Sequence, residues 1–272
     1  MNIGMFTSEQ GTSFIEVLIA LAITGIVTLS IFKLYIVQHE NYSIQSDITD
    51  IQQNARATID ELTRHIRMAG YNLPYGIPGI EASNQFCGSI TITYFNSGCE
   101  SYLSTAMTSP GDNLQCADDV SCFQPGQWIY IFDSDSAYGE WIELAQVNSA
   151  SKTLDYTQTS LSHTYNTNTL VMALTQVKFY VDYVSDPYNP KLMLKLHGRD
   201  PMVYAENISD LQLTYTMKNG VTLDQPDVIE NTRQIQISIT GRSGQPSLDE
   251  NGNDTYRYKN YATTIYLRNF GV

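Results

Sequence analysis

An uncharged apolar segment near the amino terminus limits what this chain can fold into. No residue between Val17 and Phe32 carries a charge, and Glu16 and Lys33 flank the segment. Apolar side chains would cover every face of a helix built from it, so such a helix has no polar side to present to water. The segment therefore belongs in a lipid bilayer or among other helices.

The length of this segment favours a membrane span. A helix needs about 20 largely apolar residues to cross the hydrocarbon core of a bilayer, and residues 14–37 exceed that length with only two charges. A buried helix of a soluble protein is the plainer alternative, but such helices usually carry a polar stripe. A secretory signal peptide fits poorly, because residues 1–11 contain no Lys or Arg and the apolar run ends in KLYIVQHE.

The apolar pattern changes after this segment but remains helical. Apolar residues recur every three or four positions at Ile44, Ile48, Ile51, Ala55, Ile59, Leu62, Ile66 and Ala69. That spacing places them on one face of a helix, and no proline interrupts residues 12–69. We therefore expect one helix of about 58 residues, roughly 87 Å long, which is apolar in its first half, amphipathic in its second and ended by Gly70.

The pattern after Pro74 is typical of β-structure. Eight segments are rich in β-branched and aromatic residues, often in alternation, and turn-forming pieces separate them. They are residues 88–95, 127–132, 140–147, 170–184, 191–197, 211–217, 233–240 and 258–269. Together with the helix they predict an α+β fold, with the helix packed on a mainly antiparallel β head over residues 71–272.

The charge balance argues against one class of partner. The chain has 28 Asp and Glu against 15 Lys and Arg, a formal net charge of −13. Phosphate binding needs a basic face, and the only local basic group is Arg56, Arg64 and Arg67. We expect no direct contact with nucleic acid.

Four cysteines, Cys87, Cys99, Cys116 and Cys122, lie within 36 residues. Their spacing offers no C-x-x-C pair of the kind that zinc sites use. In an exported protein the default interpretation is two disulfides. Three pairings are open, and we favour Cys87 with Cys99 and Cys116 with Cys122, as local links within an insertion over about residues 82–126.

Calcium is an alternative interpretation of one acidic loop. Asp249, Asn251 and Asn253 have the D-x-N-x-N spacing that opens a calcium-binding loop, but Asp254 stands where such a loop needs Gly. Asp133 and Asp135 make a weaker pair of the same kind. Both stretches also have the composition of ordinary turns, so we predict no resident metal or cofactor.

Enzyme motifs are missing from the sequence. It contains no G-x-S-x-G, P-loop or H-E-x-x-H pattern, and the four histidines are scattered over helix and strands. His65 is expected on the polar face of the helix. We therefore predict that the chain is not an enzyme.

The start of the apolar helix resembles a known processing signal. In GTSFIEVLIALAITG, residues 11–25, a Gly is followed five residues later by Glu and then by an unbroken apolar run, which resembles the class III signal of type IV prepilins. The resemblance implies that a prepilin peptidase cuts after Gly11, that Thr12 becomes the methylated first residue and that Glu16 is the fifth. The leader departs from the family pattern, since its only charge is Glu9 and the mature chain would begin with Thr12 in place of Phe or Met.

Glu16 and Gly25 have particular roles under this resemblance. A carboxylate about one helical turn from the new ammonium can neutralise that charge, in the same chain or in a neighbouring subunit. Glu16 is therefore expected to act in assembly. For Gly25 two interpretations stay open: a packing glycine of a membrane helix, or the marker of a stretch that, in the family, can lose helical structure.

Two further motifs narrow the resemblance. R-x-A-G-Y at residues 67–71 and T-x-x-L-R-N at residues 264–269 are similar to the PilW family of type IV minor pilins, and more distantly to the J-type minor pseudopilin of type II secretion. The resemblance implies that residues 12–37 anchor the chain in the bacterial inner membrane and later join a filament core, and that residues 38–70 continue the same helix. The head would be periplasmic, and extracellular after assembly.

The function implied is that of a minor pilin, which helps to initiate a pilus at or near its tip. Its partners would be other minor pilins and the major pilin, through the amino-terminal helices, and the prepilin peptidase. A type II secretion pseudopilin remains an alternative with the same anchor. A tip adhesin that uses the insertion between Cys87 and Cys122 is an alternative from another class. A major structural subunit is disfavoured by the large head.

Overall fold

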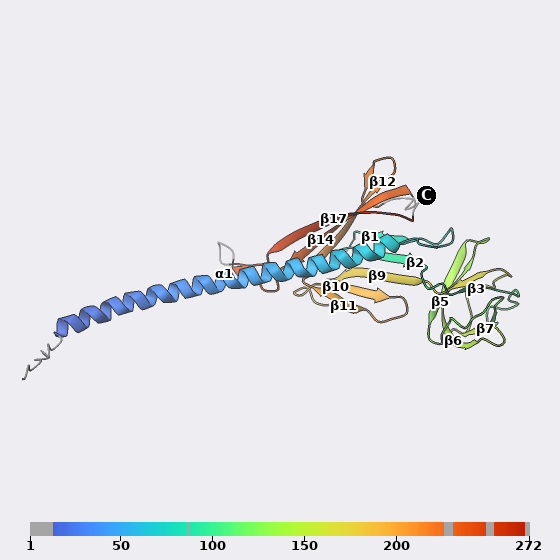
Figure 1. The fold of residues 1–272 in the computed structure, drawn as a ribbon, viewed down its shortest axis with the longest axis horizontal. Helices are drawn as coiled ribbons and strands as arrows, with labels where there is room; N and C mark the ends of the chain where they lie inside the picture. The colour runs from blue at the N-terminus through green and yellow to red at the C-terminus, as the bar shows by residue number, and fades with distance from the viewer. Residues whose placement is uncertain (1–12, 86, 226–230, 249–252, 270–272) are drawn as a thin grey trace, which may run out of the picture. The chain divides into compact units, whose positions relative to one another are not determined.

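The computed structural model describes residues 13–85, 87–225, 231–248 and 253–269. The chain divides into two compact units, Met1–Asp50 and Ile51–Val272. One helix, α1 (Phe14–Met68), runs through the boundary, and the later structure consists of antiparallel sheets (Figure 1). The prediction of one long amino-terminal helix followed by a β-rich head is therefore confirmed.

The first part of α1 is apolar and exposed. All described residues from 13 to 43 are exposed, and the exposed fraction reaches 79% at Phe14. The hydroxyls of Thr24, Thr28 and Ser30 each donate to the backbone carbonyl four residues earlier, at 2.7 to 2.8 Å. The helix thus satisfies its own hydroxyl groups, as a segment in a bilayer must, and by length and composition it can span one.

The second part of α1 packs on the head through the predicted stripe. Ile51, Ala55, Leu62 and Ile66 are all buried. Polar contacts fix the same segment, since the amide of Asn54 donates to the carbonyl of Glu206 at 3.1 Å. The change from an all-round apolar pattern to a one-sided pattern therefore coincides with the part of the helix that the head covers.

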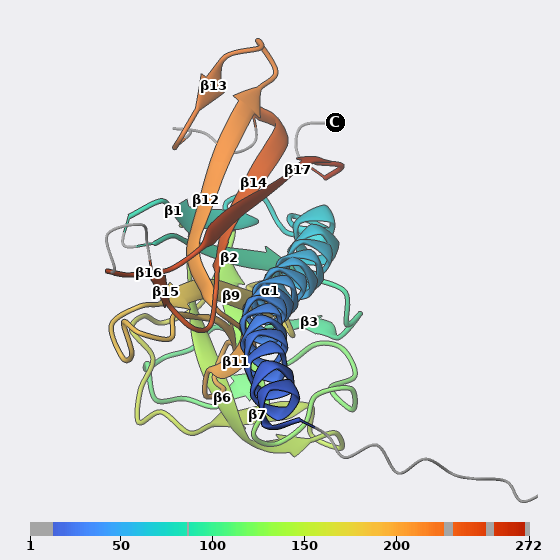
Figure 2. The ribbon, with the colours of Figure 1, turned by 90° about the vertical axis from the view of Figure 1, so that its left-hand side faces the viewer.

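Two antiparallel sheets, called here the central sheets, form the main body of the head (Figures 1 and 2). The five-stranded sheet has the order β1-β2-β9-β10-β11, and the four-stranded sheet has the order β13-β12-β14-β17. The strands of the first are β1 (Ile80–Ser83), β2 (Ser89–Tyr94), β9 (Thr175–Asp182), β10 (Lys191–Leu196) and β11 (Met202–Glu206). Those of the second are β12 (Ile208–Met217), β13 (Thr222–Leu223), β14 (Thr232–Arg242) and β17 (Tyr258–Tyr266), and β15 (Ser247–Leu248) pairs with β16 (Asp254–Thr255).

One hydrophobic core joins α1 to both central sheets. Alternation along β14 places Ile235, Ile237 and Ile239 on a single buried face, as the two-residue period of a strand requires. These side chains belong to the same cluster as Leu62 and Ile66 of the helix. The helix is therefore a structural part of the head's core.

Residues 96–174, called here the inserted lobe, interrupt the five-stranded sheet between β2 and β9. Their sheet has the order β3-β8-β5-β6-β7-β4 and its own core. The strands are β3 (Glu100–Tyr102), β4 (Leu114–Gln115), β5 (Trp128–Asp133), β6 (Tyr138–Asn148), β7 (Thr153–Tyr156) and β8 (Leu170–Met172). The predicted insertion over residues 82–126 is thus wrong at both ends, because β2 pairs with β9 in the central sheet and the lobe continues to residue 174.

The end of α1 is closed by two separate devices. Gly70 has φ +73°, a left-handed conformation that suits glycine after a helix end, and its N–H donates to the carbonyl of Thr93 at 3.0 Å. The amide of Asn269 donates to the carbonyls of Arg67 and Ala69, at 3.2 and 3.1 Å. The last described residue of the chain thus satisfies carbonyls that a helix end leaves open.

Replacement of Asn269 by Ala should lower the free energy of unfolding by about 1 kcal/mol. It removes one part-buried hydrogen bond, to the carbonyl of Ala69, and one exposed hydrogen bond, to that of Arg67. Urea unfolding of the full chain in detergent, followed by far-ultraviolet circular dichroism, measures the change. Asn113→Ala is the matched control, since Asn113 is exposed in the inserted lobe. Equal stability of the two variants would contradict the capping role.

Candidate functional site

Glu16 lies in the first turn of α1, where its backbone N–H donates to the carbonyl of Ser13 at 2.9 Å. The helix dipole favours a carboxylate at this end. The side chain is exposed, and among the described residues no ion pair of Glu16 is found. Gly11 and Thr12, the predicted processing residues, lie outside the described residues, so the cut between them stays a prediction.

Gly25 lies in the middle of the exposed apolar part of the helix. A Cβ atom built on it would meet nothing within 4 Å. No neighbour in the described chain therefore requires a glycine here. Both interpretations of Gly25, close packing against another helix and local loss of helical structure, remain predictions.

The favoured disulfide pairing is wrong. The structure joins Cys99 to Cys122, with 5.7 Å between their Cα atoms, and leaves Cys87 and Cys116 as free thiols. Cys87 packs against the core of the central sheets, whereas the other three cysteines belong to the inserted lobe. The two short links expected from local spacing are therefore replaced by one longer link within the lobe.

Both free thiols are protected by burial. Burial raises the pKa of Cys116 to about 11, although a hydrogen bond with Ser101 acts in the opposite direction. Burial is also the main cause that raises the pKa of Cys87, with a smaller contribution from Asp210. Because the thiolate is the reactive form, neither thiol is suited to nucleophilic chemistry near neutral pH.

The calcium prediction is untested at its principal residues. Asp249 and Asn251 lie outside the described residues, and Asn253 alone makes no site. The carboxylate of Asp133 accepts hydrogen bonds from the N–H of Asp135 at 3.0 Å and the hydroxyl of Ser136 at 2.8 Å, so it closes its own turn. Within the described ranges, no group of three His, Cys, Asp or Glu side chains suited to a metal is found.

The prediction that His65 lies on the polar face of the helix is wrong. Its side chain is buried, and the Nε2 atom lies 3.1 Å from Glu61 while the hydroxyl of Tyr94 lies 3.2 Å from Nδ1. Nη2 of Arg64 also lies 3.1 Å from Nε2. A neutral ring can therefore either donate from Nε2–H to Glu61 and accept from Tyr94 at Nδ1, or accept from Arg64 at Nε2 and donate from Nδ1–H to Tyr94. Arg64, which pairs with Glu61, completes the cluster.

This cluster predicts a loss of stability in mild acid. Burial, followed by the charge of Arg64, lowers the pKa of His65 below its ordinary 6.5. In the unfolded chain the imidazole of His65 becomes protonated near pH 6.5, whereas in the folded chain it stays neutral to a lower pH. The free energy of unfolding is therefore highest above pH 6.5 and falls as the pH drops towards 5. Urea unfolding at pH 7, 6 and 5 measures the fall.

The variant His65→Gln should show a shallower fall in stability between pH 7 and pH 5. Some dependence should remain, because burial and Lys195 also lower the pKa of His197. His39→Gln is the control, since His39 lies exposed on the same helix. An unchanged slope in His65→Gln would show that another group controls the acid response.

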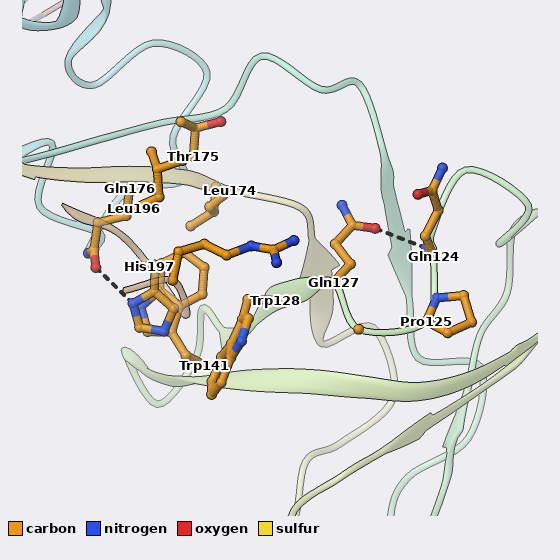
Figure 3. A pocket seen from close by; sticks show the side chains of 12 residues that line it. Gln124, Pro125, Gln127, Trp128, Trp141, Leu174, Thr175, Gln176, Leu196 and His197 are labelled. Atoms are coloured by element: carbon orange, nitrogen blue, oxygen red, sulfur yellow. Dashed lines mark hydrogen bonds between the residues drawn. The ribbon is translucent and has the colours of Figure 1, made fainter. Parts of the chain in front are cut away.

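A pocket of about 380 Å³, called here the seam pocket, lies where the inserted lobe meets the five-stranded sheet. Trp128 of β5 and Trp141 of β6 face His197, which follows β10 (Figure 3). The rings of Trp141 and His197 stack with centroids 3.9 Å apart, and the ring of Trp128 meets His197 edge-on at 5.0 Å. The remaining lining residues are Gln124, Pro125, Gly126, Gln127, Leu174, Thr175, Gln176, Leu196 and Arg199.

The positions of the pocket side chains are fixed by their neighbours. The side chain of Gln176 lies 3.1 Å from Nδ1 of His197, which holds the imidazole in place (Figure 3). Gly198 has φ +70°, and a Cβ atom built on it would lie 2.0 Å from Trp128. The turn after β10 therefore needs glycine to bring His197 against the tryptophans.

The sequence interpretation missed this pocket. A signal was present, because the chain has only two tryptophans and both fall in neighbouring predicted strands. In the structure Trp141 is opposite Tyr130 in the β5–β6 ladder, which puts both indoles on one face of the hairpin. The contribution of His197 could not be seen, since it depends on the packing of the lobe against the sheet.

Two sequence comparisons give no relative of this chain. No protein-family model matches the sequence, and no curated protein gives a match. The functional interpretation therefore depends on the residues of the chain itself.

Proposed function

We propose that this chain is a minor pilin of a type IV pilus, anchored in the inner membrane by α1 and then transferred into a filament. The observation that carries the proposal is the division of α1 (Phe14–Met68). Its first part exposes apolar side chains on every face, and its second part is built into the core of the head. A helix of this kind needs an apolar environment outside its own chain.

Three further features support this proposal. The Gly11 to Glu16 signal precedes the uncharged segment, Glu16 stands at the start of the helix, and the hydroxyls within the segment are bonded to its own backbone. Transfer from lipid to a bundle of equivalent helices then leaves the backbone hydrogen bonds unchanged. Burial of each large apolar side chain contributes about 1.5–3 kcal/mol relative to exposure in water, so the helix stays out of water throughout.

The intact mass of the mature protein tests the proposal. In a host with an active prepilin peptidase, we expect a chain that begins at Thr12 and carries one methyl group. In a matched host without the peptidase, the mass should correspond to a chain that begins at Met1. A mass that begins at Met1 in both hosts would overturn the processing step and with it the assignment to this class.

The secretion pseudopilin alternative has the same anchor and would give the same mass. Deletion of the gene separates the two roles, because loss of pili with normal protein secretion supports the minor pilin. Loss of secretion with normal pili would support the pseudopilin.

A further inference from the structure

We propose that the seam pocket binds a saccharide that carries a carboxylate. The proposal concerns the head alone and does not rest on the assembly role of α1. It comes from three properties of the lining: aromatic rings held at fixed positions, planar amide side chains, and a local excess of positive charge in an acidic chain. Each property matches a different part of such a ligand.

The aromatic rings match the apolar face of a sugar. A pyranose ring presents a set of C–H groups on one face, and the negative face of an indole attracts such weakly positive groups. Trp128 and Trp141 are half-buried, and both border the pocket. One face of Trp141 is covered by the stacked imidazole of His197, 3.9 Å away, and Tyr130 packs against the same indole at 5.2 Å. The surface offered to a sugar is therefore assigned to Trp128, which His197 meets only edge-on. This indole is a rigid surface that loses little freedom when a ligand binds.

The amide side chains match the hydroxyl groups of a sugar. Each amide offers both donors and acceptors. Gln124 is exposed at the rim, where its backbone N–H donates to the side chain of Gln127 at 2.9 Å (Figure 3). That bond leaves the side-chain amide of Gln124 for a ligand. Polar groups of this kind give orientation to a ligand that the aromatic rings hold.

The charges around the pocket favour an anionic ligand. Arg199 lines the pocket itself. A smaller hollow of about 180 Å³ shares Gln176 and His197 with it and adds Lys178 and Lys195. Three cations thus line two hollows that share Gln176 and His197, in a chain with a net charge of −13. A guanidinium is well suited to bind a carboxylate in two places.

Two carboxylates line a third hollow that adjoins the seam pocket. Glu81 and Glu140 line this hollow of about 260 Å³, which shares Trp141 with the pocket. The carboxylate of Glu140 is already occupied, since it accepts from the N–H of Ser162 at 2.9 Å and the hydroxyl of Tyr165 at 2.9 Å. Repulsion from these carboxylates therefore favours a ligand whose own carboxylate lies at Arg199.

Tryptophan fluorescence reports directly on this site, because the only two tryptophans of the chain line it. The full chain is held in a detergent without a sugar head group and titrated with glucuronate oligosaccharides, galacturonate oligosaccharides and sialyllactose. Each acidic ligand has a matched neutral control. For the uronate oligosaccharides it is the same oligosaccharide with its carboxyl groups reduced, and for sialyllactose it is lactose. Isothermal calorimetry on the same samples detects binding that leaves the fluorescence unchanged.

We expect at least one acidic saccharide to change the tryptophan fluorescence in a saturable way. Its neutral counterpart should bind roughly tenfold more weakly, because it lacks one charged hydrogen bond. Arg199→Gln should weaken acidic binding by about the same factor, and Gln124→Ala should weaken acidic and neutral ligands alike. Arg233→Gln, at an exposed position on β14, should change nothing. All three side chains are exposed, so these variants should fold.

Three results would overturn the proposal. The first is the absence of saturable binding by any of the saccharides. The second is binding that calorimetry detects without a change in fluorescence, which would place the ligand elsewhere. The third is equal affinity for acidic and neutral forms, or unchanged affinity in Arg199→Gln.

Discussion

A chain that carries Glu16→Val is expected to reach the membrane at the normal level but to be depleted roughly tenfold or more from sheared filaments. Valine removes a charge that is costly in lipid, so insertion should not suffer. In a filament, however, the ammonium of the processed amino terminus would lose its partner. Loss of one member of a buried ion pair costs about 3–5 kcal/mol, and each 1.4 kcal/mol corresponds to about a factor of ten.

The control for this prediction is Glu40→Val, the same replacement at an exposed position of the same helix. It should leave incorporation unchanged, since Glu40 lies beyond the uncharged segment. Quantitative immunoblots of membrane and filament fractions measure both variants. Normal incorporation of Glu16→Val would rule out a role of this carboxylate in assembly.

The second large effect is expected from Leu62→Ala, which should lower the free energy of unfolding by about 2–5 kcal/mol. Leu62 is fully buried, and it belongs to the core shared by α1 and the two central sheets. Truncation removes apolar contacts and leaves a cavity between elements that cannot easily close. Denaturant unfolding of the full chain in detergent, followed by far-ultraviolet circular dichroism, measures the loss.

Leu223→Ala provides the comparison for this truncation. Leu223 lies exposed on the edge strand β13, where substitutions usually change stability by less than about 0.5 kcal/mol. Similar losses in the two variants would mean that the helix does not anchor the head. A large loss at Leu62 alone would support the shared core.

The helix was predictable because its signals are local. Each signal spans only a few turns of helix: the uncharged run, the change to apolar residues every three or four positions, and Gly70 at the end. The observed bounds of α1, Phe14–Met68, differ little from the expected ones. The same holds for the strands of six residues or more, whose β-branched and aromatic segments are continuous in the sequence. Shorter strands such as β1 and β11 were not predicted. Local propensity and burial agree in these elements.

The partition of the strands was not predictable, because pairing partners are distant. Residues 170–184 were expected as a single segment, yet β8 pairs with β5 in the inserted lobe and β9 pairs with β2 in the central sheet. The apolar, β-branched composition of residues 170–184 gives no sign of the break between the two strands. Only the packing of the whole lobe decides where one strand ends and the next begins.

The same lack of distant information explains the errors at single residues. Short spacing favoured a link between Cys87 and Cys99, but these cysteines pack against different cores. His65 was predicted to be exposed to solvent because it is polar. Tyr94, which lies 29 residues later in the sequence, supplies a buried hydrogen-bond partner. Both errors arise where a tertiary contact outweighs the local preference.

The bond between Asn269 and the end of α1 has a consequence for the order in which this protein can fold. It joins residues 202 and 200 positions apart, and β17 also completes the sheet that covers the helix. Contacts so distant in the sequence form slowly. During synthesis, the earlier strands therefore have unpaired edges that favour aggregation. The sheet over the helix is complete only after β17 has been made.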